Sequence, residues 1–177
     1  MQYLLNIVCF DKLTILCNQE NFILRSNTYM IQQVFPSYQL FVKPAVVNGH
    51  DTGRAKNGMF IAIPETVKNQ VEDISPDNFR VQVLKVNLKT TCCLLVNSYF
   101  PCDPRTHGRE DPELLETINC IKSVLSKTQF DSVIWCGDVN ADFVRGTNHT
   151  QRVQEAVDEL NLYTLWDEHT VDFTSVH

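Results

Sequence analysis

The chain has 177 residues, of which 44% are hydrophobic and 20% are charged, so it can bury a core and is not a disordered polymer. Its formal net charge of −6 argues against a protein that coats nucleic acid by bulk electrostatics, although a local basic rim would still permit phosphate contacts. The seven cysteines form no CxxC pair, and most lie in apolar runs, which favours a reducing compartment over a disulfide framework.

The first segment, residues 1–10, is apolar with helical spacing, and it lacks the basic start and small-residue cleavage site of a signal peptide. Asp11 interrupts it far short of a membrane span. We therefore expect an intracellular protein, nuclear or cytoplasmic, without a signal peptide or transmembrane segment. The next apolar run, residues 13–17, predicts a short strand that leaves Glu20 where the strand ends.

Two pairs of strands follow in the pattern of the sequence. Residues 38–42 and 58–63 are predicted to be neighbouring strands, because the loop between them is polar and contains glycine. Apolar and polar residues alternate along residues 79–88, and a second strand-like segment, residues 91–99, follows after a short polar connection. This pattern predicts an antiparallel pair of strands. The second strand of this pair ends at Tyr99.

The helix signals lie in the second half of the chain. Asp111 is an acceptable N-cap before a proline, and an apolar stripe continues through Lys127, so this is the strongest predicted helix. Thr150 is predicted to cap a second amphipathic helix, with Val153, Ala156, Val157 and Leu160 on one face. Strand pairs that alternate with helices, without a regular βαβ rhythm, indicate mixed sheets covered by helices.

Between these helices, an apolar run from residue 132 to 136 stops at Gly137 and is followed by Asp138 and Asn140. The run predicts a strand covered on both faces, and alternation along a strand would place the two polar side chains on the same side. A carboxylate can hold Mg²⁺ or orient a nucleophile, and a carboxamide can donate to a phosphoryl oxygen. The same residues also commonly form a turn, so this motif alone leaves both interpretations open.

The order of polar residues at strand ends is more specific than any single motif: Glu20, Tyr99, Asp138 with Asn140, then Asp172 with Thr174. This order resembles the endonuclease/exonuclease/phosphatase superfamily, which includes DNase I, apurinic/apyrimidinic endonucleases and the endonuclease domains of non-LTR retrotransposons. The matching motifs are a strand ending in Gln-Glu (13–20), a Gly-Gly strand with Asn57 replacing the first glycine (56–63), a Tyr-x-Pro strand (94–101) and Gly-Asp-x-Asn (137–140).

The resemblance implies a single domain over residues 1–177 with a DNase I-like, four-layered α/β/β/α sandwich of mixed sheets. It also implies site roles. Glu20 would bind Mg²⁺, with Mn²⁺ as an alternative. Tyr99 would contact phosphate or position a proton, Asp138 would orient the attacking water, and Asn140 would donate to phosphate. Thr174 would be a second phosphate contact.

Each residue taken alone has a simpler explanation. Glu20 is consistent with a solvated residue after a core strand, and Tyr99 with an edge aromatic whose hydroxyl lies in water. Asp172 and Thr174 are typical of a turn. The histidines show neither HxH nor HExxH spacing, so we do not expect zinc.

Two departures from the family pattern concern the ends of the domain. Members usually begin with a strand that carries an asparagine, whereas Met1 here begins inside the predicted first helix. They end with a strand that carries an Asp-His pair, and His177 follows Asp172 too closely, with no aspartate before it, to supply that pair. The resemblance therefore implies an incomplete domain with weak or no activity, because a main acid/base group is missing.

The expected function is that of a Mg²⁺-dependent phosphodiesterase. Its expected substrate and binding partner is nucleic acid, most of all DNA, and no binding to membranes is expected. The retrotransposon type is preferred because the connections are short. Two alternatives stay open: a non-catalytic binding module that keeps the fold, and a phosphoesterase acting on inositol phosphates or lipids. The sequence is silent on oligomeric state.

Overall fold

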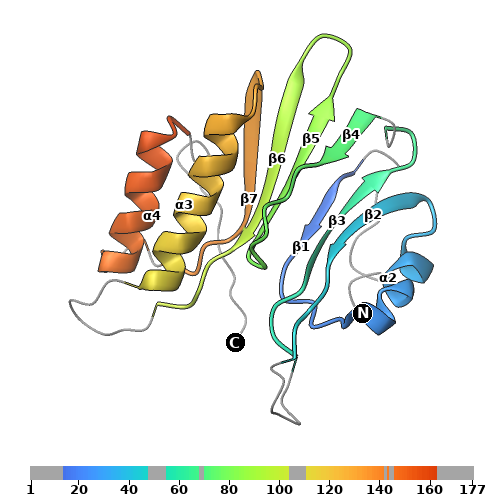
Figure 1. Ribbon diagram of the computed structural model, residues 1–177, viewed down its shortest axis with the longest axis horizontal. Helices are drawn as coiled ribbons and strands as arrows, with labels where there is room; N and C mark the ends of the chain where they lie inside the picture. The colour runs from blue at the N-terminus through green and yellow to red at the C-terminus, as the bar shows by residue number, and fades with distance from the viewer. Residues whose placement is uncertain are drawn as a thin grey trace.

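The computed structural model describes residues 14–47, 55–67, 70–103, 111–141, 143 and 146–162, and it contains two β-sheets with helices on their outer sides (Figure 1). The elements, in chain order, are β1 (Leu16–Asn18), the 3-10 turn η1 (Arg25–Asn27), α2 (Tyr29–Val34), β2 (Tyr38–Lys43), β3 (Met59–Pro64), β4 (Val71–Asp73), β5 (Val81–Asn87), β6 (Cys92–Tyr99), α3 (Pro112–Lys127), β7 (Ser132–Asp138) and α4 (Asn148–Glu159). The predicted first helix and the residues Asp172, Thr174 and His177 lie outside the described residues.

The first sheet is antiparallel, in the order β1-β3-β2, and the second has the order β4-β5-β6-β7. In the second sheet β5 pairs antiparallel with both β4 and β6, whereas β6 and β7 are parallel. A parallel pair needs a crossover connection, and α3 lies on it. Tyr99 and Asp138 are register partners as a result, and they mark the ends of their two strands.

Three apolar clusters hold four layers together. The stripe of α3 and the face of α4 pack on β5 and β6, through residues such as Leu94, Ile121 and Val153. On the other side, Ile31 of α2 packs against Phe60 of β3. Between the sheets, Ile61 and Ile63 of β3 contact Leu84 and Leu95 of the second sheet. These contacts confirm the predicted α/β/β/α layers, in which the second sheet is mixed and the described strands of the first sheet are all antiparallel.

Buried amides also join the two sheets. Gln82 and Asn97 are both 0% exposed, and a buried amide is stable only where it is hydrogen-bonded. Gln82 Nε2 on β5 donates to the Phe41 carbonyl of β2 at 2.8 Å. Asn97 Nδ2 on β6 donates to the Asn18 carbonyl of β1 at 3.2 Å. The relative placement of the sheets is therefore specified by directional bonds as well as by apolar packing.

Two local predictions are corrected, and two short elements were missed. The Gly-Asp strand β7 is an edge strand within the described chain, with Ile134 57% exposed, so it is not covered on both faces. The second helix is capped by Thr147, whose hydroxyl accepts from the Thr150 backbone N–H, so Thr150 is not the cap. The short elements α2 and β4 were not predicted from the pattern. None of the described helices is long and apolar enough to cross a membrane.

Candidate active site

The candidate site lies at the edge where β1, β6 and β7 end. Asn97, two residues before the end of β6, donates to the Asn18 carbonyl at the end of β1 and accepts from the side chain of Gln19. These bonds bring the end of the first sheet to the edge of the second, where Tyr99 and Asp138 are already neighbours. Glu20 follows Gln19 directly, so residues more than 110 positions apart in the sequence meet at one edge.

Glu20 and Tyr99 interact directly. Tyr99 is 8% exposed and its hydroxyl donates to the exposed carboxylate of Glu20. Burial first, and then this hydrogen bond and the negative charge of Glu20, raise the pKa of Tyr99 well above its ordinary value. The phenol therefore stays protonated across the neutral range and is a hydrogen-bond donor in this site.

The backbone around Glu20 adopts positive φ at two positions, Glu20 (+51°) and Phe22 (+55°). Left-handed backbone is costly for such residues and persists only where its surroundings hold it. Here Asn21 N–H donates to the Gly58 carbonyl and Phe22 N–H to the Asn57 carbonyl, both at 3.1 Å. Asn57 itself has φ +63°, a conformation that asparagine tolerates, which explains why it can replace the first glycine of the family motif.

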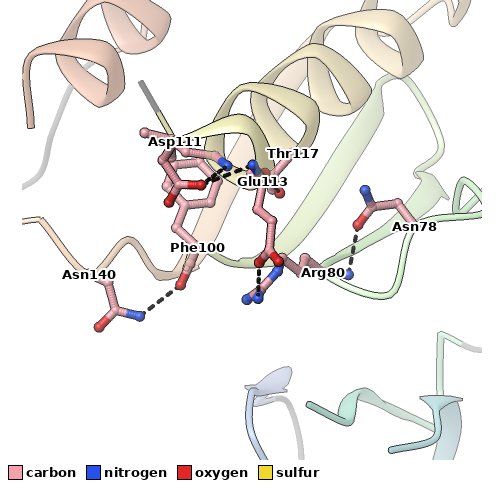
Figure 2. A network of polar contacts seen from close by, with 8 residues as sticks. Asn78, Arg80, Phe100, Asp111, Glu113, Thr117 and Asn140 are labelled. Atoms are coloured by element: carbon pink, nitrogen blue, oxygen red, sulfur yellow. Dashed lines mark hydrogen bonds and ion pairs between the residues drawn. The ribbon is translucent and has the colours of Figure 1, made fainter. Parts of the chain in front are cut away.

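The Gly-Asp-x-Asn segment is held against the end of β6. Phe100 N–H donates to the Asp138 carbonyl at 2.8 Å, and Asn140 Nδ2 donates to the Phe100 carbonyl at 2.8 Å (Figure 2). Asp138 Oδ1 also accepts from the Asn140 backbone N–H at 2.9 Å. Because β7 ends at Asp138 and Asn140 has φ +48°, strand alternation does not place these two side chains, and an Asx turn does.

Glycine is required at position 137 because the backbone of β6 passes very close to it, and not because the strand ends there. It lies inside β7 with φ +142°, and a Cβ added there would be 1.8 Å from the Ser98 carbonyl oxygen of β6. Any side chain at this position would separate the two strands beside Tyr99 and Asp138. The strand β7 continues through Gly137 and ends at Asp138.

Arg80 is a site residue that the sequence analysis missed. Its guanidinium carbon lies 5.3 Å from the centre of the Tyr99 ring, and its Nη2 pairs with Glu113 Oε2 at 2.8 Å (Figure 2). Asp111, the N-cap of α3, accepts from the Glu113 backbone N–H and so holds that first turn in place. The Arg80 side chain is only 12% exposed, and its Nε and Nη1 have no hydrogen-bond partner among the described residues. The sequence pattern places Arg80 inside the predicted strand 79–88 and gives no signal of this contact.

The carboxylate of Glu20 fits one kind of cation. Glu20 is exposed, and the described residues contain no cluster of three or more His, Cys, Asp or Glu side chains that could enclose a metal. Mg²⁺ is usually held by one or two carboxylates, with waters and substrate phosphate completing its shell, and does not need a closed protein cage. The donor set therefore fits Mg²⁺ or Mn²⁺ shared with a phosphate.

Comparison with solved structures found several similar chains. The endonuclease domain of TRAS1, a telomere-specific non-LTR retrotransposon, superposes with a TM-score of 0.50 at 20% identity over 71% of this chain and 55% of that domain. A truncated Caenorhabditis elegans TDP2 has a TM-score of 0.48 at 14% identity, over 76% of this chain and 52% of that protein. The human Nocturnin catalytic domain has 0.48 at 17% identity, over 86% of this chain and 59% of that domain.

No model of a known protein family matches the sequence, and no curated protein sequence matches it. The chain spans a little over half the length of these three solved structures. At these identities the likeness concerns the fold. The chain has the DNase I-like α/β/β/α fold that the resemblance to the endonuclease/exonuclease/phosphatase superfamily implied.

Proposed function

We propose that this chain is a metal-dependent phosphodiesterase domain that cuts nucleic acid in the manner of a retrotransposon endonuclease. DNA is its preferred substrate in this proposal. The observation that carries the proposal is the meeting of Glu20, Tyr99, Asp138 and Asn140 at one edge, joined by the hydrogen bonds of Asn97 and the Phe100 backbone. The likeness in fold to the TRAS1 endonuclease domain supports the class of reaction.

Each residue has a chemical task in this proposal. Glu20 would hold Mg²⁺ or Mn²⁺, which when bound supplies a positive charge against the phosphodiester. The exposed carboxylate of Asp138 would accept a hydrogen bond from the attacking water and orient it. Asn140 and the protonated Tyr99 would donate to phosphate oxygens, where charge increases in the transition state. The Arg80 guanidinium would hold the Tyr99 ring in place by a cation–π contact with the face of the ring, and it would add positive charge beside it.

The test is nicking of supercoiled plasmid with Mg²⁺ or Mn²⁺, comparing the natural chain with Asp138→Asn. This substitution keeps an oxygen that can accept from the Asn140 N–H, so the Asx turn survives while the carboxylate charge is lost. We expect nicking to fall by about 10²–10⁴-fold, the usual contribution of such a group.

Asp131→Asn is the matched control. Asp131 also accepts a backbone hydrogen bond, from Cys92 N–H at 2.7 Å, but it lies at the opposite end of β7. Both variants therefore make the same charge change next to the same strand. Equal loss of nicking in the two variants would contradict the proposed role of Asp138. Folded protein that binds DNA without nicking it would indicate a binding module. Release of phosphate from inositol phosphates or lipids, without nicking, would indicate the phosphoesterase alternative.

A further inference from the structure

Two cysteines meet where the first sheet faces the second. Cys17 lies on β1 and Cys136 on β7, and both pack into the apolar layer between the sheets that contains Ile61, Ile63 and Leu95. These two strands contact one another across that layer. Both cysteines are free thiols and partly buried. The sequence pattern separates them by more than 100 residues and gives no sign of the pair.

The two thiols are hydrogen-bonded to each other. Cys136 Sγ also lies 3.2 Å from the Val96 carbonyl oxygen, to which it can donate as a thiol. The bond from the Cys17 thiol lowers the pKa of Cys136 and, with burial, raises the pKa of Cys17.

The backbone holds the two sulfurs together. Asn97 is the register partner of Cys136, and its side chain donates to the carbonyl of Asn18, the residue after Cys17. A part-buried hydrogen bond therefore joins β1 to β6, the strand that pairs with β7, one residue after Cys17 and at the register partner of Cys136. This bond helps to hold the two cysteine-bearing strands near each other.

We propose that Cys17 and Cys136 form a redox-sensitive dithiol site, which a low-molecular-weight disulfide such as glutathione disulfide converts into a disulfide bond between the two sheets. One cysteine of the pair, as its thiolate, attacks one sulfur of glutathione disulfide, forms a mixed disulfide and releases one glutathione thiolate. The other cysteine then loses its proton and attacks the sulfur of the first, which releases the second glutathione thiolate. Two cysteine thiols are oxidised, one glutathione disulfide is reduced to two thiols, and the two protons pass to the released thiolates.

The bond has a consequence that rests on the proposed function. A disulfide holds its sulfurs at about 2.05 Å, closer than two hydrogen-bonded thiols, so it draws β1 and β7 together. Glu20 lies three residues after Cys17, and Asp138 lies two residues after Cys136. Because a displacement of about 1 Å in a catalytic group can cost about 10²-fold in rate, we expect the oxidised protein to nick DNA at least about tenfold more slowly.

Peptide mapping tests the bond without any activity. Trypsin releases residues 13–25, which contain only Cys17, and residues 128–145, which contain only Cys136. The folded chain is equilibrated with glutathione disulfide, free thiols are blocked, and the digest is analysed by mass spectrometry. We expect a linked pair of these two peptides that separates on reduction and lies about 2 Da below the sum of the reduced masses. Cys120→Ser, which changes another partly buried cysteine, should leave the linkage intact.

Cys17→Ser must remove the linked species. The proposal is overturned if the folded, oxidant-treated protein yields the two peptides reduced, separately glutathionylated, or joined to other cysteines. If the peptides are linked but the oxidised protein nicks DNA as fast as the reduced protein, the proposed effect on the site is wrong. If neither form nicks DNA, the proposed function fails while the linkage result stands by itself.

Discussion

Replacing Gly137 by alanine tests the closest backbone contact beside the candidate site. The new Cβ would lie 1.8 Å from the Ser98 carbonyl oxygen and within 3 Å of two more Ser98 backbone atoms, all of which are main chain and cannot rotate away. Real Cβ atoms essentially never approach another heavy atom within 3.0 Å, so β6 and β7 would have to separate by more than 1 Å at this point. The φ of +142° adds backbone strain for alanine.

The magnitude follows from these two terms. Left-handed or otherwise restricted φ costs about 1–3 kcal/mol for a residue with a Cβ. Separating the strands disrupts ladder hydrogen bonds, each contributing about 1 kcal/mol, and loosens the register of Tyr99 with Asp138. We therefore expect Gly137→Ala to lower the free energy of unfolding by about 3–5 kcal/mol, which is a large part of the about 5–15 kcal/mol that a domain possesses.

Urea unfolding followed by circular dichroism measures this loss, with Gly146→Ala as the matched control. Gly146 also has positive φ, +58°, but nothing lies within 4 Å of the position of its Cβ. The control should lose only the conformational term, about 1–2 kcal/mol. The reasoning would be refuted by a Gly137→Ala protein that is no less stable than the Gly146→Ala protein, because the contact with Ser98 would then have no cost.

Three further predictions concern residues around the site. Tyr99→Phe should lower plasmid nicking by about 10-fold or more while changing stability by less than about 1.5 kcal/mol, since it removes only the hydroxyl that donates to Glu20. Because the pKa of Tyr99 is raised in the folded protein, the unfolded chain loses this proton at a lower pH than the folded chain does. The stability of the wild-type protein should therefore fall from about pH 10 upward. Urea midpoints compared at pH 9 and 11 should show that this part of the fall is absent in Tyr99→Phe. Asn97→Ala should lower the free energy of unfolding by about 1–3 kcal/mol, because the partly buried Asn18 carbonyl loses its donor, and nicking should fall as well. Unchanged urea midpoints would contradict the bridging role of Asn97. Arg80→Lys should change stability little, because the side chain of its ion-pair partner Glu113 is 62% exposed. It should weaken DNA binding measured by fluorescence anisotropy, because lysine lacks the guanidinium donors that have no partner in the described chain. Equal affinity of the two proteins would show that these donors do not bind DNA.

Much of the local structure could be predicted because it depends on residues close together in the sequence. The N-cap Asp111, the proline at the first position of α3 and the apolar stripe predicted that helix with its bounds, and the side chain of Asp111 does accept from the first turn. The strands β2, β3, β5, β6 and β7 lie where alternation or apolar runs predicted them. The short elements α2 and β4 were not predicted, because segments of six and three residues are too short to show a hydrophobic period.

The candidate site could be predicted only as an order of polar residues. Glu20, Tyr99, Asp138 and Asn140 were chosen because each follows a predicted strand, and the structure brings all four to one edge. Their catalytic roles remain predictions. The neighbours that hold them were not visible, because a buried asparagine or an arginine before a strand looks the same in sequence whether or not it faces a site. The Asx turn at Asp138 also shows that the turn interpretation and the site interpretation are compatible.

The sequence by itself determined the periodic elements, the start of the main helix and the positions where polar residues follow strands, because caps, alternation and helical stripes act over a few residues. Only the tertiary structure decided which strand ends meet, that β7 lies at an edge, that Arg80 lies against Tyr99, and that Cys17 and Cys136 share one contact between the sheets. The physical reason is that these arrangements depend on contacts between distant residues, and such contacts are selected by how two whole sheets and their buried amides fit together.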